Sequence, residues 1–525
     1  MNAFFSELFH FFSQNLYKIG DQLLVHIGIT FISLFLSIFV ALPLGVFLSK
    51  FPKLAPPILS FASILQTIPS IALLGLMIPI LGIGLKPAVF VLFLYALLPI
   101  LRNTYTGISQ VDGSVKEAAL AMGMTPFQVL WKVELPLAIP IIFAGIRIAT
   151  VINVGVATLA AYIGAGGLGE FIFGGISLNN PYMMLGGAIP AALLAIFLDY
   201  LLSKAEFLNL SKSKNWFWGL ILLAGLSGLY EVPRIGSGKI LAGLTPEFYG
   251  RKDGYLGLKS IYQLKLNYVI ISDAIMYKAI RDGDLDLISG YSTDGRIRAY
   301  HLMTLVDNRH IFPPYQAAPL ISTQWIRHYP ILKEIIQSLS GKINDSIMTE
   351  LNFEVDFKKK DPNEVALEFL KRNHLFKKPL EEGSEKFIIG SKIFPEQYIL
   401  SAMYASLIRG NTHLKVITKT GLGGTQVCFN ALVHHEIDMY PEYTGTGLLV
   451  ILKPSEKVLG QLNSDPQKVF QYVQDEFSNK FQLNWLQPIG FNNSYCLVMR
   501  KGEIDKENIH SIEDLARFIK SSALK

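Results

Sequence analysis

Long apolar runs separated by short polar connections dominate the first 235 residues of the chain. A helix of roughly 20 apolar residues is long enough to cross the hydrocarbon layer of a bilayer. The second run contains Pro57, Pro69 and Pro79, and proline removes backbone hydrogen bonds, so we expect this span to be broken or tilted. The pattern predicts six membrane spans, at about 24–49, 57–82, 88–105, 137–163, 182–203 and 215–231.

The first 20 residues carry large apolar side chains near one helical face. Such a face suits a helix lying in the membrane interface, but it suits equally well an extension of the first span. Both interpretations stay open at this point. The side chains concerned are Phe4, Phe5, Leu8, Phe11, Phe12 and Leu16.

The second half of the chain has a different pattern, in which short β-branched runs alternate with amphipathic stretches. This alternation predicts an α/β domain with central sheets. The charges agree, because residues 1–235 carry only 21 of the 88 charged side chains and residues 236–525 carry the other 67. The net charge of +6 forms no compact basic patch, so nucleic acid is not an expected partner.

Basic residues orient the predicted spans, because cytoplasmic loops are enriched in lysine and arginine. The alternate connections carry almost none: Lys86 lies near one, and 164–181 has no basic residue. The N-terminus and the second half of the chain are therefore expected on the periplasmic or extracellular side. The residues that mark the cytoplasmic connections are Lys50, Lys53, Arg102, Lys116, Lys132, Lys204, Lys212 and Lys214.

Cysteine and histidine give little candidate chemistry. Cys428 and Cys496 are expected to be free buried thiols, although one disulfide is possible. His434 and His435 form an isolated pair typical of a solvated loop or helix end, and no metal-ligand cluster is predicted.

The third connection contains "VKEAALAMGMTPFQVLWKVELPLAIPIIFAGIR", residues 115–147. A break at Gly123–Pro126 predicts two short helical pieces. A short amphipathic helix here could enter a groove of another protein, or the segment could be an ordinary re-entry loop. The residues alone leave both open.

This stretch resembles the coupling loop of ABC importer permeases, with Glu117, Ala118 and Ala119 followed by Gly123 and a later Leu-Pro. The segments "LQTIPSIALLGLMIPILGIG" (65–84), "ALLPILRNTYTGI" (96–108) and "ATLAAYIGAGGLGEFIFGGI" (157–176) resemble permeases for betaine-type osmoprotectants. The resemblance implies a type I permease, a homodimer of this chain, and docking of 115–136 on a cytoplasmic ATPase. No Walker-type sequence occurs in the chain, so ATP and Mg are expected on that partner, and the chain is expected to be a transporter subunit rather than an enzyme.

Several loops of the second half present tyrosines at predicted strand ends. Tyrosine faces attract cations, and a quaternary ammonium offers no ordinary hydrogen-bond donor, so a cage of such faces would suit it. The alternative is that each tyrosine only packs. Asp294 and Arg296 are expected to pair across their turn. Glu442 could be a cage carboxylate, but a solvated or structural role is favoured for it. The loops are 288–296 with Tyr291, 311–319 with Tyr315, 438–447 with Tyr440 and Tyr443, and 488–495 with Asn492, Asn493 and Tyr495.

"FIIGSKIFPEQYIL", "TGLGGTQVCFNAL", "EIDMYPEYTGTG" and "PIGFNNSYCLVMRK" resemble the opening part of betaine, choline and carnitine binding proteins. "LAGLTPEFYGRKDGYLGL", "AIRDGDLDLISGYSTDGRI" and "LVDNRHIFPPYQAAPLI" resemble their later part. The resemblance implies a two-lobed type II periplasmic-binding-protein fold that closes on a trimethylammonium ligand. It implies cage positions at Tyr291, Tyr315 and Tyr443, with Tyr440 less favoured, and contacts to the carboxylate end of the ligand near Gln397, Thr425 and Asn493.

The two parts occur in reverse order, which predicts a circular permutation. We expect a transmembrane permease domain at 1–203, a linker with the sixth span at 204–235, and an extracytoplasmic binding domain at 236–525. Within that domain the later block of the family occupies 240–372 and the opening block 387–525, joined by the polar connector 377–386.

The prediction is therefore a multi-pass protein of the bacterial cytoplasmic (inner) membrane that combines the permease and binding subunits of an ABC importer. The resemblance suggests glycine betaine, choline or carnitine as substrate, and ergothioneine because similar fused transporters import it. Two alternatives remain. One is an amino-acid importer subunit, for which Arg296 and Asp294 are the candidate Arg–Asp pair, and the other is a membrane-anchored ligand sensor.

Overall fold

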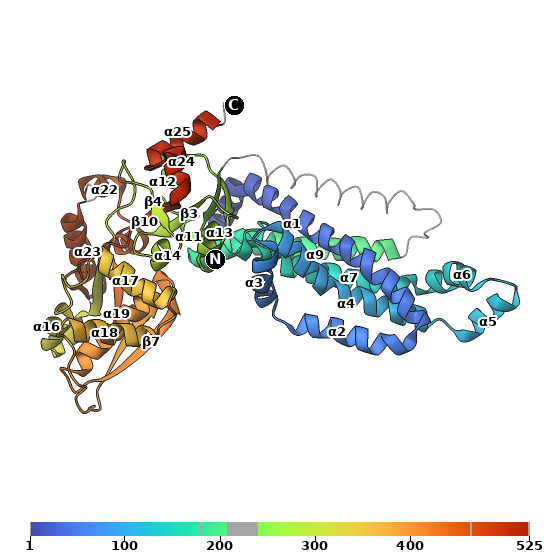
Figure 1. The fold of residues 1–525 in the computed structure, drawn as a ribbon, viewed down its shortest axis with the longest axis horizontal. Helices are drawn as coiled ribbons and strands as arrows, with labels where there is room; N and C mark the ends of the chain where they lie inside the picture. The colour runs from blue at the N-terminus through green and yellow to red at the C-terminus, as the bar shows by residue number, and fades with distance from the viewer. Residues whose placement is uncertain (1, 179, 207–239, 463–464, 523–525) are drawn as a thin grey trace. The chain divides into compact units, whose positions relative to one another are not determined.

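A computed structural model describes residues 2–178, 180–206, 240–462 and 465–522. The chain forms two compact units (Figure 1). The first unit contains Met1–Glu247 and Asn267–Asp284, and the second contains Phe248–Leu266 and Leu285–Lys525. The predicted sixth span at 215–231, and the linker beyond residue 206, lie outside the described residues.

Four long apolar helices build the first unit and confirm four of the predicted spans. The shorter second span is a bent pair, α2 and α3, with an angle of 96° between them. Ile68 is extended because it precedes Pro69, which ends α2, so the predicted break in this span is confirmed. The long helices are α1 (Asn2–Lys50), α4 (Leu85–Ser109), α7 (Leu135–Ala160) and α9 (Pro181–Glu206); the pair is α2 (Ala55–Thr67) and α3 (Ser70–Leu81).

Helix α1 runs without interruption from Asn2 to Lys50. The first 20 residues are therefore continuous with the first span, and a separate interfacial helix is not formed.

The loop between α4 and α7 contains two short helices, as predicted. Gly123 lies between them with φ +84°, a left-handed conformation that glycine adopts without strain. Thr125 and Gln128 then form a reciprocal capping box at the start of the second helix. The elements are α5 (Gly113–Ala121), α6 (Pro126–Val129) and a π-helical turn, η2 (Leu130–Glu134).

Shorter elements complete the first unit. The strands β1 and β2 pair in parallel. The elements are η1 (Pro52–Leu54), η3 (Ala161–Ile163), α8 (Gly169–Ser177), β1 (Leu241–Leu244), β2 (Asn267–Ile270) and α13 (Asp273–Asp282), and α11 (Pro246–Gly250) is divided between the two units.

The second unit is α/β, as predicted, and its strands belong to two mixed sheets. In one, β10 lies between β3 and β4 and is antiparallel to both. In the other, of order β7-β6-β8-β5-β9, β5 is antiparallel to β8 and β9, whereas β6 is parallel to β7 and β8. The strands are β3 (Leu287–Tyr291), β4 (Leu302–Thr304), β5 (Ala317–Ser322), β6 (Lys386–Lys392), β7 (Lys415–Gly423), β8 (Met439–Tyr443), β9 (Leu483–Trp485) and β10 (Tyr495–Arg500).

Each sheet combines strands from the two sequence blocks 240–372 and 387–525. Strand β10 of the second block lies in the sheet of β3 and β4, and β5 of the first block lies in the sheet of β6, β7, β8 and β9. The chain therefore crosses twice between the sheets, and Gln316 and Asn492 form an isolated bridge where the crossing segments meet. The helices of this unit are α12 (Tyr255–Ile261), α14 (Gly295–Ala299), α15 (Thr323–His328), α16 (Ile331–Gln337), α17 (Asp345–Asp356), α18 (Pro362–Arg372), α19 (Pro395–Arg409), α20 (Thr425–Val433), α21 (Thr444–Thr446), η4 (Gly447–Leu452), α22 (Glu456–Leu462), α23 (Pro466–Phe481), α24 (Lys501–Glu507) and α25 (Ile512–Ser522).

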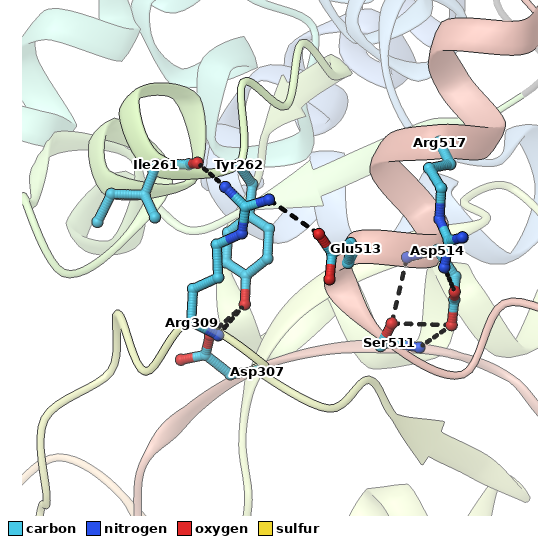
Figure 2. Close-up of polar contacts among 8 residues, drawn as sticks. All are labelled: Ile261, Tyr262, Asp307, Arg309, Ser511, Glu513, Asp514 and Arg517. Atoms are coloured by element: carbon cyan, nitrogen blue, oxygen red, sulfur yellow. Dashed lines mark hydrogen bonds and ion pairs between the residues drawn. The ribbon is translucent and has the colours of Figure 1, made fainter.

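Polar contacts fix the last helix, α25, to the second unit (Figure 2). The guanidinium of Arg309 lies over the ring of Tyr262, 5.1 Å from its centroid, and donates to Glu513 at 2.8 Å. Ser511 and Asp514 exchange hydrogen bonds that cap the start of the helix.

Both cysteines are free and buried, as predicted. His434 and His435 are exposed at the end of α20, also as predicted.

Small residues allow the long helices to approach closely, as is common in membrane bundles. A Cβ atom on Gly145 of α7 would lie 2.6 Å from the Cβ of Asn103 and 2.8 Å from the carbonyl oxygen of Pro99, both in α4. A Cβ atom on Gly155, on the same helix, would have no neighbouring atom within 4 Å among the described residues.

We expect Gly145→Val to destabilise the helix bundle, by about 1–3 kcal/mol, because the added side chain must separate α7 from α4. The measurement is the thermal stability of the detergent-purified protein, with Gly155→Val as the control. Equal melting temperatures for the two variants would contradict the close packing at Gly145.

Candidate ligand-binding site

Three tyrosines gather where the chain crosses between the sheets of the second unit. Tyr291 ends β3 and Tyr495 begins β10, and the antiparallel register places them opposite each other, with ring centroids 5.1 Å apart. Tyr315 lies two residues before β5, and its ring meets that of Tyr495 edge-on, with centroids 5.7 Å apart. The structure therefore brings together Tyr291 and Tyr315, which were predicted from separate loops, and adds Tyr495 to them.

A buried ion pair supports this tyrosine cluster. Arg251 donates two hydrogen bonds to Asp253, at 2.9 and 2.7 Å, and a third to the Tyr315 hydroxyl at 2.7 Å. The same hydroxyl donates to Asp253. The Arg251 guanidinium also lies 5.4 Å from the centroid of the Tyr495 ring, so that ring already stacks on one cation.

Sequence reasoning missed Arg251 and Asp253. The only signal was three charged residues in a row in "GRKDG", and Tyr315, the partner of Arg251, lies 64 residues away along the chain. The predicted pair of Asp294 and Arg296 does form, at 2.6 Å, and Asp294 also accepts from the backbone N–H of Arg296. That pair is local to its turn, at the start of α14.

A second group of residues converges on the fully buried carboxylate of Glu396, in the first turn of α19. One oxygen accepts from the Tyr443 hydroxyl at 2.6 Å and from Asn493 Nδ2 at 2.9 Å. The other accepts from the Thr293 hydroxyl at 2.7 Å and from Asn352 Nδ2 at 2.8 Å. Four separate segments of the chain are thus joined through one side chain.

Burial raises the pKa of the Glu396 carboxyl, and the four hydrogen bonds oppose that increase by stabilising the anion. The N-terminal turn of α19 adds a favourable helix dipole. A carboxylate that accepts four bonds at once fixes the positions of all its donors. Glu396 was not predicted, because only the folded chain brings its donors to it.

The two tyrosines of "MYPEYTGTG" have different surroundings. Tyr440 is fully buried in the apolar core, and its hydroxyl donates to Glu442 at 3.0 Å. The Tyr443 ring stacks on Phe394, with centroids 6.3 Å apart, and the ammonium of Lys392 lies 5.2 Å from its centroid. Burial raises the pKa of both tyrosines, so both hydroxyls remain protonated donors.

Glu442 itself is fully buried and forms an ion pair with Lys392, with Nζ and Oε1 2.5 Å apart. It also accepts from the backbone N–H of Tyr443 at 2.8 Å. The carboxylate is therefore held by structural partners, so of the two roles favoured from sequence the structural one is confirmed and the solvated one is wrong.

The small residues after Tyr443 allow this segment to pack closely against the loop that carries Tyr315. A Cβ atom on Gly445 would lie 2.8 Å from the Tyr315 ring, so only glycine leaves room for that ring. Thr444 accepts from the Gln316 backbone N–H at 3.1 Å and donates to the Pro314 carbonyl at 2.9 Å. These contacts tie the segment after β8 to the loop that carries Tyr315.

The other predicted positions differ in their contacts. Gln397 is fully buried, and its Nε2 lies 3.2 Å from the Tyr443 hydroxyl. Asn493 donates to Glu396, which fixes the orientation of its amide, and its buried Oδ1 has no hydrogen-bond partner among the described residues. Thr425 begins α20 and is partly exposed; among the described residues it makes no hydrogen bond to the other candidates.

The predicted loop residues of the first unit lie on and beside α5. Glu117 and Ala118 are exposed on this helix and Ala119 is buried. Gly123 donates its N–H to the Leu120 carbonyl after the helix ends.

Comparison with known protein families also divides the chain into a membrane part and a binding part. Residues 33–204 match the family described as "Binding-protein-dependent transport system inner membrane component". Residues 226–372 and 385–525 match the "Substrate binding domain of ABC-type glycine betaine transport system".

The chain is 49% identical over 191 residues to the glycine betaine/carnitine/choline transport system permease protein OpuCB of Bacillus subtilis (strain 168), over 36% of this chain and 86% of that protein. It is 48% identical to the choline transport system permease protein OpuBB of the same organism, over 38% of this chain and 93% of that protein. A solved structure described as a glycine betaine/carnitine/choline ABC transporter is 38% identical over 26% of this chain and 52% of that chain, with a TM-score of 0.23.

We expect Glu396→Ala to loosen the segments that donate to it, because four buried donors would lose their acceptor. Hydrogen exchange followed by mass spectrometry should show protection of peptides from 288–299 and 439–446 reduced by at least about tenfold, or ~1.4 kcal/mol.

Glu385→Ala is the control, since Glu385 is partly exposed and bonds to Tyr329 instead. Unchanged exchange of both peptides in the Glu396 variant would show that the carboxylate does not hold them.

Proposed function

The chain belongs to the family of inner membrane components of binding-protein-dependent transport systems, and it also carries a substrate binding domain of the ABC-type glycine betaine transport family. From this premise we propose that it captures and imports quaternary-ammonium compounds. Its role is transport rather than catalysis. The observation that carries the proposed ligand is the gathering of Tyr291, Tyr315 and Tyr495 at the crossing between two sheets.

Tyrosine faces suit this ligand for a physical reason. A trimethylammonium group spreads its positive charge over methyl groups and donates no ordinary hydrogen bond, so a ring face stabilises it better than a hydrogen-bond acceptor does. The Arg251 guanidinium already lies over the Tyr495 ring, as Lys392 does over Tyr443, so Tyr291 and Tyr315 are proposed as the main cation-binding faces and Tyr495 as their support.

Among betaine-type ligands, the contacts of Asn493 favour one that carries a hydroxyl group. Its amide nitrogen donates one of its two N–H groups to Glu396, and its Oδ1 has no hydrogen-bond partner among the described residues. A hydroxyl could both donate to this oxygen and accept from the second N–H, whereas a carboxylate could use only the N–H. Choline and carnitine have that hydroxyl and glycine betaine does not. We therefore place choline and carnitine ahead of glycine betaine and ergothioneine.

At the other end of the ligand, Gln397 and Thr425 are proposed contacts for a carboxylate. Tyr443 is proposed to act through its hydroxyl and the edge of its ring, because Phe394 and Lys392 already lie against the ring. Tyr440 is proposed to support Glu442 and not to touch the ligand, because it lies in the apolar core.

We further propose that a separate cytoplasmic ATPase, which binds ATP and Mg, docks on the coupling loop, and that two copies of this chain form the transporter. The exposed apolar side chains beside Glu117 and Gly123 support such a docking surface, since water is a poor neighbour for them. They are Leu120, Met122, Phe127 and Trp131. The binding domain is proposed to lie on the outer side of the bacterial cytoplasmic membrane.

The reversed block order is proposed to be a circular permutation. Two observations support it: the binding-domain family matches two stretches separated by 373–384, and β5 and β10 each join strands of the other block. The proposal is that the family fold forms with its two parts in the reverse order.

An amino-acid importer is the second candidate, because Arg251 and Asp253 are the groups that would hold an α-carboxylate and an α-ammonium. In the described structure each already bonds to the other and to Tyr315. An amino acid would have to separate this buried ion pair, which is costly.

Titration calorimetry on the detergent-purified full chain separates the candidates. Choline, carnitine, glycine betaine, ergothioneine and histidine are the ligands to compare. We expect the trimethylammonium compounds to bind and histidine not to bind. Binding of histidine alone would reject the tyrosine cage.

The same measurement tests one face of the cage. We expect Tyr291→Ala to weaken binding of the best ligand by at least about tenfold, or ~1.4 kcal/mol, because the face is lost. Tyr291→Phe, the matched control, keeps the face and should keep most of the affinity. An unchanged affinity for Tyr291→Ala would remove this residue from the site.

A further inference from the structure

A buried carboxylate lies at the cytoplasm-facing loop predicted for the first unit. Glu134 is the last residue of η2, and its side chain is only 5% exposed. Its Oε2 lies 2.7 Å from Nζ of Lys50, and its Oε1 lies 3.3 Å from Nζ of Lys116. One anion is therefore shared by two cations.

The three charges come from three different elements. Lys50 is the last residue of α1, Lys116 lies in α5, and Glu134 directly precedes α7. Lys116 also donates to the carbonyl of Ile108 at 3.2 Å, near the end of α4. Three long helices and the short helix that carries Glu117 thus meet at one ionic contact.

Because Glu134 is buried, the free energy of this ion pair depends strongly on how close the two lysines lie. A buried anion is stabilised only while its cations stay close, because it has little water to replace them. A movement of α5 that carried Lys116 away would leave Glu134 with one partner. The energy of the contact therefore depends on where α5 lies relative to α1 and α7.

The backbone at this point is also not a regular helix. Residues Leu130–Glu134 form a π-helical turn, and Pro136 follows it without an N–H to donate. Short π-helical turns inside helices are frequent at functional sites, since their hydrogen bonding is readily rearranged. A displacement of the segment that carries Glu134 would therefore act on a turn that is already irregular, and not on the regular part of α7.

We propose that Glu134 is a positioning residue for transport: through Lys116 and Lys50 it transmits a displacement of α5 to the ends of α1 and α7. The inference rests on the proposed function, in which the partner ATPase moves the coupling loop. It assigns a role to a residue outside the loop signature Glu117, Ala118, Ala119 and Gly123.

The test uses the full chain with its ATPase in proteoliposomes and measures uptake of the best-binding ligand together with ATP hydrolysis. We expect Glu134→Gln to lower the ratio of ligand transported to ATP hydrolysed by at least about fivefold, while the dissociation constant of the ligand changes by less than about twofold. Lys53→Gln is the control, because Lys53 is an exposed lysine that lies three residues after Lys50 and outside the segment 115–136.

Lys116→Met is the second variant, since it leaves the pair of Lys50 and Glu134 intact and so protects folding. We expect it to lower the same ratio. The double variant Lys116→Met with Glu134→Gln should be no worse than Glu134→Gln alone, because both changes remove one shared contact. Additive losses, or an unchanged ratio in Glu134→Gln, would overturn the inference.

A wrong substrate proposal would be detected by a different measurement from the one that tests Glu134. It would appear as absent binding of trimethylammonium ligands to the unmodified chain, before any variant is compared. Transport of another ligand would still allow the ratio to be measured, so the role of Glu134 is tested in either case.

Discussion

The buried carboxylate of Glu396 is the interaction on which the candidate site depends. It accepts four hydrogen bonds, from residues on the loop after β3, on α17, at the end of β8 and just before β10. A buried anion without such donors would be strongly unfavourable, so the four segments are stabilised together or not at all. Two of its donors, Tyr443 and Asn493, are themselves proposed ligand contacts, and a third, Thr293, lies two residues after Tyr291. The tyrosine cluster is then completed from the neighbouring crossing segment, where Gly445 leaves room for the Tyr315 ring.

The first unit uses a comparable arrangement for a different purpose. Glu134 is also buried, but it is held by two lysines from other elements, and its surroundings include a π-helical turn. Four hydrogen-bond donors hold Glu396, whereas Glu134 is held by two lysines that lie on separate helices. We propose that the first carboxylate organises capture of the ligand and that the second links the coupling loop to the membrane helices.

The sequence predicted those features that depend on local pattern. Four spans and the broken second span follow from apolar length and from Pro69, and the two helical pieces around Gly123 follow from the glycine break. Tyr291 and Tyr315 were predicted because turn residues mark the loops that carry them. Arg251, Asp253 and Glu396 were missed because their partners are distant along the chain: the Asn493 amide lies 97 residues from Glu396. The separate interfacial helix at the N-terminus was one of two open interpretations, and α1 continues through it because no residue there breaks the helix.

One polypeptide is proposed both to capture the ligand and to carry it across the membrane. The most direct test of this proposal is uptake of choline by proteoliposomes that contain only this chain and its ATPase, with no soluble binding protein added. The account predicts ATP-dependent accumulation that Tyr291→Ala reduces at low choline concentration. Uptake that appears only after a separate binding protein is supplied would contradict it.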